Sequence, residues 1–230
     1  MPQNRFNSMK ATPPLNNQKA ATVVVFDFET TGLSPEQGDR AIEIGAVKLV
    51  EGEVVDTFQG LMNPGRAVSS FIESFTGISN SMLVNAPPCE VVMAEFAEFI
   101  AGYNLLAHNA SFDRKFLEAE FARINYDYTG SIGCTLLTSR RLFQDAPNHK
   151  LSTLVRFKGL PSDGVFHRAL ADAQMTAHLW MKLLEEVTLQ SGVEQPSFNE
   201  LLKLSTLPKQ KVTVYLSKLS KQSRKEKPHR

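Results

Sequence analysis

Two acidic residues, Asp27 and Glu29, end an apolar run at residues 23–28 that is typical of a buried β-strand. Side chains alternate between the two faces of a strand, so both acids lie on one face with Cα atoms about 7 Å apart. Two negative charges about 6 Å apart repel by roughly 3 kcal/mol at an effective dielectric constant of 20. Hydration at an exposed strand end is the ordinary explanation for an isolated pair of acids. A cation bound between the two carboxylates would instead neutralise the repulsion.

Two further acids stand near the beginnings of predicted helices. Asp113 lies near the start of the helix predicted at 111–125, and Asp172 near the start of the helix predicted at 168–190. Apolar residues three or four positions later lie on the same helix face as each acid. Each acid is therefore expected at the N-terminal end of a row of buried apolar side chains. The helix dipole favours an acid in the first turn, but it does not explain this alignment. We therefore expect four carboxylates to face one pocket: Asp27, Glu29, Asp113 and Asp172.

These four carboxylates would carry a charge of about −4, which two divalent cations would neutralise. Oxygen ligands without cysteine favour Mg²⁺ or Mn²⁺ over zinc. Two such ions form the clamp that catalyses in-line phosphoryl displacement. His167, five residues before Asp172, falls in the loop before the last predicted helix. A histidine beside such a site suits a general base, since its pKa lies near neutrality, although a surface histidine is the ordinary alternative.

Composition sets the class of protein. The chain has 230 residues, of which 42% are apolar, enough for one domain with a full core. Cys89 and Cys134 lack the spacing of a metal site, and reduced thiols predict a cytoplasmic protein. No apolar run approaches the ~18 residues that a membrane span needs, so we expect no membrane partner.

The order of the predicted elements defines the fold class. Three strands come first, with a hairpin turn at Glu51 and Gly52, then strands alternate with helices, and helices follow. This order predicts an α/β fold with a mixed central sheet. Ser111 is the expected cap of its helix. The predicted strands are 23–28, 41–50, 53–62, 104–108 and 130–135, and the main predicted helices are 87–103, 111–125, 136–143, 149–159 and 168–190.

Both ends of the chain differ from this core. Residues 1–21 are rich in Asn, Gln and Pro, and we predict a disordered leader. Residues 191–230 form a predicted basic C-terminal extension, in which positions 207–230 hold eight Lys or Arg and one Glu. Such a charge run suits a polyanionic partner, but it is more often only solvated.

Three stretches resemble the motifs of a known enzyme family: DFETTGL at 27–33, AHNASFD at 107–113 and HRALADA at 167–173. In this order and spacing they are similar to the DEDDh class of 3′→5′ exonucleases. This DnaQ-like group, which includes the proofreading epsilon subunit of bacterial DNA polymerase III, has a ribonuclease H-like fold with helices on both faces of the sheet. The resemblance covers roughly residues 22–190, and AIEIGAV and FTGIS inside that range also look like the family.

The resemblance implies roles for individual residues. It makes residues 22–190 an exonuclease domain and Asp27, Glu29, Asp113 and Asp172 the ligands of two Mg²⁺ or Mn²⁺ ions, with His167 as the general base. It also implies that the 3′-terminal nucleotide contacts Thr30, Thr31, Gly32 and Leu33. We expect Leu33 to be an apolar wedge against the bases. We further expect His108 and Asn109 to bind substrate, although His108 is alternatively a residue that shapes its own turn. Phe28 faces away from the acids and is not expected to stack on a base.

The expected substrate is the 3′ end of single-stranded nucleic acid, from which the enzyme would release nucleoside 5′-monophosphates. DFETTGL favours DNA and proofreading, and the family also allows a DNA polymerase subunit as partner. An RNA-trimming enzyme would use the same five residues, because the 2′-hydroxyl contact that separates RNA from DNA is not visible in the sequence. A non-catalytic adaptor that binds nucleic acid is the third possibility. The intact set of five functional residues argues against it.

Overall fold

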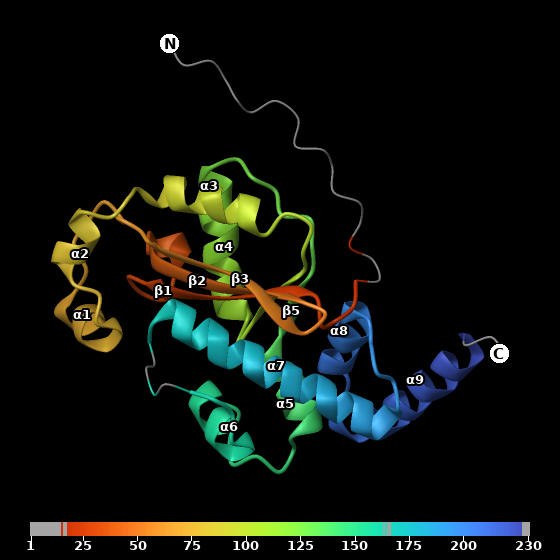
Figure 1. Ribbon diagram of the computed structural model, residues 1–230. Coiled ribbons are helices and arrows are strands. Elements are labelled where there is room, and N and C mark those ends of the chain that lie inside the picture. The colour runs from red at the N-terminus through yellow and green to blue at the C-terminus, as the bar shows by residue number, and fades with distance from the viewer. Residues whose placement is uncertain (1–14, 16–17, 163, 165–166, 227–230) are drawn as a thin grey trace.

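The computed structural model describes Leu15 and residues 18–162, 164 and 167–226 (Figure 1), except for the side chains of 223–226. Most of the predicted leader therefore lies outside the described residues. Its last part is ordered, contrary to our prediction: Ala20 has no exposed surface, and its carbonyl accepts a hydrogen bond of 2.8 Å from the Trp180 indole N–H. A buried backbone carbonyl requires such a partner, so this segment is part of the core.

A mixed sheet of five strands forms the centre of the molecule. Its spatial order is β3-β2-β1-β4-β5. The first three strands pair antiparallel, whereas β1, β4 and β5 pair parallel. The predicted α/β class with a mixed sheet is confirmed. The strands are β1 (Val23–Thr30), β2 (Ala41–Val50), β3 (Glu53–Leu61), β4 (Leu105–Ala107) and β5 (Ile132–Cys134).

Every main predicted helix is present, and the structure adds α1, α2, α8 and α9 to this set. The α8 helix has a capping box of Ser197 and Glu200, a sequence signal that could have identified it. Ser111 is the first residue of α4 and not its cap, because Ala110 before it already has helical dihedral angles. The α-helices are α1 (Ser70–Thr76), α2 (Asn80–Val84), α3 (Cys89–Phe99), α4 (Ser111–Arg123), α5 (Thr135–Leu142), α6 (Leu151–Lys158), α7 (Ala169–Ser191), α8 (Phe198–Thr206) and α9 (Val212–Glu226).

The two faces of the sheet are covered by different helices, as the alternation in β1 predicts. Phe26 and Phe28 lie in a buried cluster with residues of α3 and α4. Val23 and Val25 lie in a second buried cluster with residues of α7, α8 and α9. Asp27 and Glu29 continue this second face, so they emerge where α7 begins. In Figure 1 the start of α7 lies at the same end of the sheet as α1, whereas α9 lies at the opposite end.

The first turn of α7 lies directly on strand β2, and Gly45 permits this contact. A methyl group on Gly45 would overlap the backbone of Ala169 and Leu170. Gly45 stands opposite Asp27 in the β1–β2 ladder, so the close contact is next to the first acid. Separately, none of the described helices has the length and apolar character to cross a membrane.

We predict that Gly45→Ala destabilises the protein by about 1–3 kcal/mol, the usual cost of overpacking a core. The added methyl meets backbone atoms, which move only if the whole helix moves. The measurement is urea unfolding followed by circular dichroism. Gly60→Ala is the matched control, because the atoms nearest its added methyl belong to the side chains of Val92 and Phe58 and not to the backbone. An equal or smaller loss for Gly45→Ala than for the control would contradict this packing.

Candidate active site

Three carboxylates gather where β1 ends and α7 begins. Oxygen atoms of Asp27, Glu29 and Asp172 all lie within 4.8 Å of one another. Asp113, at the start of α4, lies beside them, and its Oδ1 accepts a hydrogen bond of 3.2 Å from the Phe28 N–H. The structure thus brings the four acids expected from the sequence to one place, from β1, α4 and α7.

These acids line a cleft of about 740 Å³ whose other wall is apolar. The cleft also contains the other residues that we predicted as its parts. Its lining residues are Asp27–Leu33, Ser69, Phe71, Ile72, Phe75, Thr76, His108, Asn109, Phe112, Asp113, Leu151, His167 and Asp172. A largely apolar cleft with a few convergent polar groups is the usual form of a binding site for an organic ligand.

Burial and the charges of neighbouring acids raise the pKa values of the clustered carboxyl groups. Burial, and then the charges of Asp172 and other neighbours, raise the pKa of Glu29 to about 8. Burial raises the pKa of Asp113 to about 7, although the hydrogen bond from the Phe28 N–H opposes this shift. Asp27 keeps some exposed surface, yet burial of its carboxyl and the charges of Asp113 and Asp172 raise its pKa well above the ordinary value.

The donor set therefore fits a divalent cation. It consists of hard carboxylate oxygens within a few ångströms, and burial raises the pKa of Glu29 and of Asp113. Such oxygen ligands bind Mg²⁺, Mn²⁺ or Ca²⁺ in proteins. We conclude that the cluster is a candidate divalent-metal site.

His167 lies in the loop before α7, as its spacing from Asp172 predicts. Its backbone N–H donates a hydrogen bond of 2.8 Å to Asp172 Oδ2, and its φ of 63° is in the left-handed region. Its exposed imidazole packs on the Phe75 ring of α1, with 3.9 Å between the ring centroids. The histidine is thus on the wall of the cleft, joined to the acid cluster through its own backbone.

The loop after β1 presents one apolar side chain to solvent. Leu33 is 78% exposed at the cleft, consistent in position with the predicted wedge. The Thr30 hydroxyl donates to the Gly32 carbonyl over 2.6 Å. The Thr31 hydroxyl donates to Asp39 over 3.0 Å. Both hydroxyls therefore shape the loop itself, and Leu33 is the side chain that the loop offers to a ligand.

His108 and Asn109 line the cleft in different ways. Both ring nitrogens of His108 have partners within the protein, Thr135 Oγ1 at 2.9 Å and the His149 carbonyl at 3.0 Å. Burial lowers the pKa of His108 to about 4, so its ring is neutral at pH 7. These contacts suit a residue that shapes its turn more than one that binds substrate. Asn109 is exposed, with a φ of 63°.

The apolar wall of the cleft was not predicted from the sequence. Phe71 is 70% exposed and Phe75 is 48% exposed, and their rings stack on α1 with centroids 5.8 Å apart. Their spacing of four residues could have been noticed, but in a short helix it reads as an ordinary buried face. Only the structure shows that this face borders the cleft.

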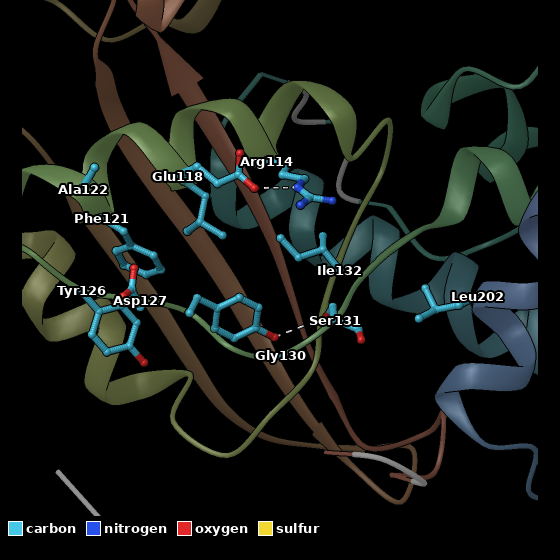
Figure 2. Close-up of a pocket in the computed structure, with 12 residues that line it drawn as sticks. Arg114, Glu118, Phe121, Ala122, Tyr126, Asp127, Gly130, Ser131, Ile132 and Leu202 are labelled. Atoms are coloured by element: carbon cyan, nitrogen blue, oxygen red, sulfur yellow. Dashed lines mark hydrogen bonds and ion pairs between the residues drawn. The ribbon is translucent and has the colours of Figure 1, made fainter. Parts of the chain in front are cut away.

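A second hollow of about 590 Å³ lies on the outer side of α4 (Figure 2). Figure 2 shows Arg114 and Glu118 joined as an ion pair above the chain that links α4 to β5. Its lining comes from α4, from this connection and from Leu202 of α8, and it includes none of the predicted site residues. The acid-lined cleft is therefore the candidate active site.

Comparison with known proteins identifies the family. The family model described as an exonuclease, RNase_T, matches residues 24–180, which contain all four acids and His167. The chain belongs to this exonuclease family, and the family recognised from the three motifs is confirmed. Within the family, the curated relatives point to one branch.

The chain is 41% identical over 193 residues to a PolC-type DNA polymerase III of Caldanaerobacter subterraneus subsp. tengcongensis. It is 38% identical over 174 residues to the PolC-type DNA polymerase III of Bacillus cereus. These matches cover 84% and 75% of the chain but only 14% and 12% of the relatives, so the chain spans about an eighth of their length.

Two solved structures share the fold. Exonuclease X, in a complex with duplex DNA that has a 5′ overhang, superposes with a TM-score of 0.63 at 24% identity and covers 80% of this chain and 99% of its own. The nuclease domain of 3′hExo, a DEDDh family member bound to rAMP, gives a TM-score of 0.62 at 25% identity. This second match covers 77% of this chain and 96% of its own. The predicted ribonuclease H-like architecture agrees with both structures.

The raised pKa values predict how the stability of the metal-free protein depends on pH. Glu29 and Asp113 bind protons more tightly in the folded protein than in the unfolded chain, so their protonation favours folding. This contribution is complete below the unfolded pKa values and is lost as pH rises through the folded ones. We therefore expect the free energy of unfolding in EDTA to fall between about pH 5 and pH 8.

The measurement is urea unfolding at several pH values, with and without Mn²⁺. A bound cation compensates the ionised acids, so saturating Mn²⁺ should flatten or reverse this part of the profile. A metal-free profile that rises between pH 5 and pH 8 would contradict the described electrostatics.

Proposed function

We propose that this chain is a 3′→5′ exonuclease that hydrolyses the terminal phosphodiester of single-stranded DNA and releases nucleoside 5′-monophosphates. The observation that carries this proposal is the gathering of Asp27, Glu29, Asp113, Asp172 and His167 at one cleft, in a chain of the exonuclease family. We assign the activity to residues 22–190. Residues 191–230 remain a basic extension in this proposal, although α8 and α9 pack against α7.

In this mechanism the four acids would hold two divalent cations, Mg²⁺ or Mn²⁺. The bound ions would neutralise the phosphate and make the attacking water more acidic. Asp27 and Glu29 are fixed by β1, and Asp172 is fixed by α7, so their relative positions depend on how the helix packs on the sheet. Asp113 is oriented by the Phe28 N–H, which occupies its Oδ1.

His167 acts as the general base. It accepts the proton of the water at an imidazole nitrogen, and the hydroxide attacks the phosphorus in line with the 3′-oxygen. The bond from phosphorus to the 3′-oxygen then breaks, and that oxygen takes a proton from solvent to give the new 3′-hydroxyl. The loop carrying His167 is joined to Asp172 through the His167 N–H, which keeps the base near the acids. A general base typically contributes about 10²–10⁴-fold to the rate.

The opposite wall of the cleft binds the bases of the strand. Leu33 and Phe71 are largely exposed there, and aromatic rings stack on any base irrespective of sequence. DNA is favoured because the matched curated relatives are DNA polymerases, which also supports a proofreading role beside a polymerase in the cytoplasm. RNA is the second candidate, because one similar structure contains rAMP.

The direct test uses the chain with a 5′-labelled single-stranded oligonucleotide in Mg²⁺ and in EDTA. Shortening from the 3′ end that occurs in Mg²⁺ but not in EDTA supports the proposed exonuclease activity. A mobility shift without shortening would instead support an adaptor that only binds nucleic acid. Parallel digestion of DNA and RNA of the same sequence decides the preferred substrate.

We predict that Asp172→Ala abolishes cleavage, because it removes one of three clustered carboxylates. His167→Ala should lower kcat by about 10²–10⁴-fold, the usual contribution of a general base. Initial rates on the labelled strand measure both effects. Circular dichroism provides the control that each variant is folded, and an undiminished kcat in His167→Ala would exclude His167 as the base.

Phe71→Ala should weaken binding of a single strand, because stacking on an aromatic side chain contributes about 1–3 kcal/mol per base. The expected change is a rise in KM with little change in kcat, since Phe71 lies at the apolar wall and not among the acids. Leu189→Ala is a matched control, because Leu189 is also exposed, at 79%, but lies near the C-terminal end of α7. Equal KM values for the two variants would contradict a stacking role.

A further inference from the structure

A fifth acid, Glu43 of β2, lies beside the metal-binding cluster but has no exposed surface. It stands directly opposite Glu29 in the antiparallel ladder between β1 and β2. A carboxylate next to the cluster would ordinarily be a candidate ligand. Its buried position in the largely apolar strand AIEIGAVKLV requires a physical explanation, because a buried charge is costly unless it is paired.

The oxygens of Glu43 are occupied by the beginning of α7. Arg168 forms a bidentate pair with it, from Nε to Oε2 at 3.1 Å and from Nη2 to Oε1 at 2.8 Å. The Ala169 N–H, the first of α7, donates to Oε2 at 3.1 Å. Gln59 of β3 donates to Oε1 at 3.0 Å. With four donors directed at it, Glu43 is engaged as a hydrogen-bond acceptor and not as a metal ligand.

This arrangement joins the sheet to the segment that carries two of the site residues. His167 directly precedes Arg168, and Asp172 lies one helical turn after it. Gly45, two residues from Glu43 on the same face of β2, lets the α7 backbone contact the strand. The carboxylate also satisfies an N–H that a helix terminus leaves without an internal partner.

We propose that Glu43 and Arg168 are positioning residues: their ion pair fixes the start of α7 on β2, and so holds Asp172 and His167 at the correct distance from Asp27 and Glu29. The inference rests on the proposed exonuclease function. A bidentate guanidinium–carboxylate pair restricts orientation as well as distance, which a point charge does not. Arg168 also acts on Glu29, whose pKa its positive charge lowers against the larger effect of burial.

The chain contains a matched control for this pair. Glu120 of α4 is 1% exposed and forms a bidentate pair with Arg40, at 2.8 and 2.9 Å. It also accepts a hydrogen bond from the backbone N–H of Ala41 at 3.3 Å. Its chemistry is thus the same as that of Glu43, but it lies two turns beyond Asp113 and does not hold α7. Loss of either carboxylate should destabilise the fold, whereas only loss of Glu43 should disturb the site.

The experiment compares Glu43→Gln, Arg168→Lys and Glu120→Gln in the full chain. Three quantities are measured: kcat and KM on the labelled single strand, Mn²⁺ affinity by calorimetry without substrate, and thermal unfolding in EDTA. Loss of a residue that orients metal ligands typically costs about 10–100-fold in metal affinity or activity. We expect Glu43→Gln to show a loss of this size in kcat and in Mn²⁺ affinity, with KM unchanged.

Arg168→Lys should show a smaller loss of the same kind, because lysine keeps the charge but not the fork of two donors. Glu120→Gln should unfold at a lower temperature while it keeps the wild-type kcat and Mn²⁺ affinity. If Glu43→Gln does not fold, Arg168→Lys is interpreted by the same criteria.

Two results would overturn the inference. One is a Glu43→Gln variant that loses stability like Glu120→Gln but keeps the wild-type kcat and Mn²⁺ affinity. The other is a loss confined to KM. If the wild-type chain does not shorten any oligonucleotide, the proposed function fails, and the Mn²⁺ measurement alone then decides whether the pair positions the site.

Discussion

The repulsion among carboxylates at the end of β1 is the constraint around which this structure is organised. Asp27, Glu29 and Asp172 have oxygens within 4.8 Å, and burial raises the pKa of Glu29 to about 8. No fold gains stability from such a cluster by itself. The apolar packing of the rest of the molecule holds the acids together. Binding of a cation to the cluster would stabilise the folded protein further.

The packing of both faces of β1 holds the acids in place. Phe26 and Phe28 anchor β1 against α3 and α4, while Val23 and Val25 anchor it against α7. The acids continue the second face beyond the last valine, at the point where α7 starts. The N-terminal turn of α7 contacts β2 at Glu43 and Gly45, and the loop before it contacts Asp172 through the His167 N–H.

The cleft divides its chemistry between two walls. Charged and titratable groups are on the side of β1, α4 and α7, whereas Phe71, Phe75 and Leu33 form an apolar side. Such a division suits a ligand with an anionic backbone and flat apolar rings, which describes a nucleic acid strand. The family match and the PolC-type relatives agree with this reading, although the chain corresponds to only about an eighth of those relatives.

The sequence by itself determined the fold class, the five strands, the main helices and the identity of the four acids. These features depend on local periodicity and on motif spacing, which one chain displays directly. It predicted the face of Asp27 and Glu29 correctly because a strand alternates with a period of two. It also had the signal for α8, a capping box, which went unused.

Only the tertiary structure decided which groups meet. Phe71 and Phe75 are distant in sequence from the acids, and nothing local shows that α1 borders the cleft. The pairing of Glu43 with Arg168 joins residues 125 positions apart, and both ring nitrogens of His108 are taken by residues far along the chain. Such contacts arise from the packing of whole elements, whose relative placement is set by many weak apolar contacts together and is encoded in no short segment.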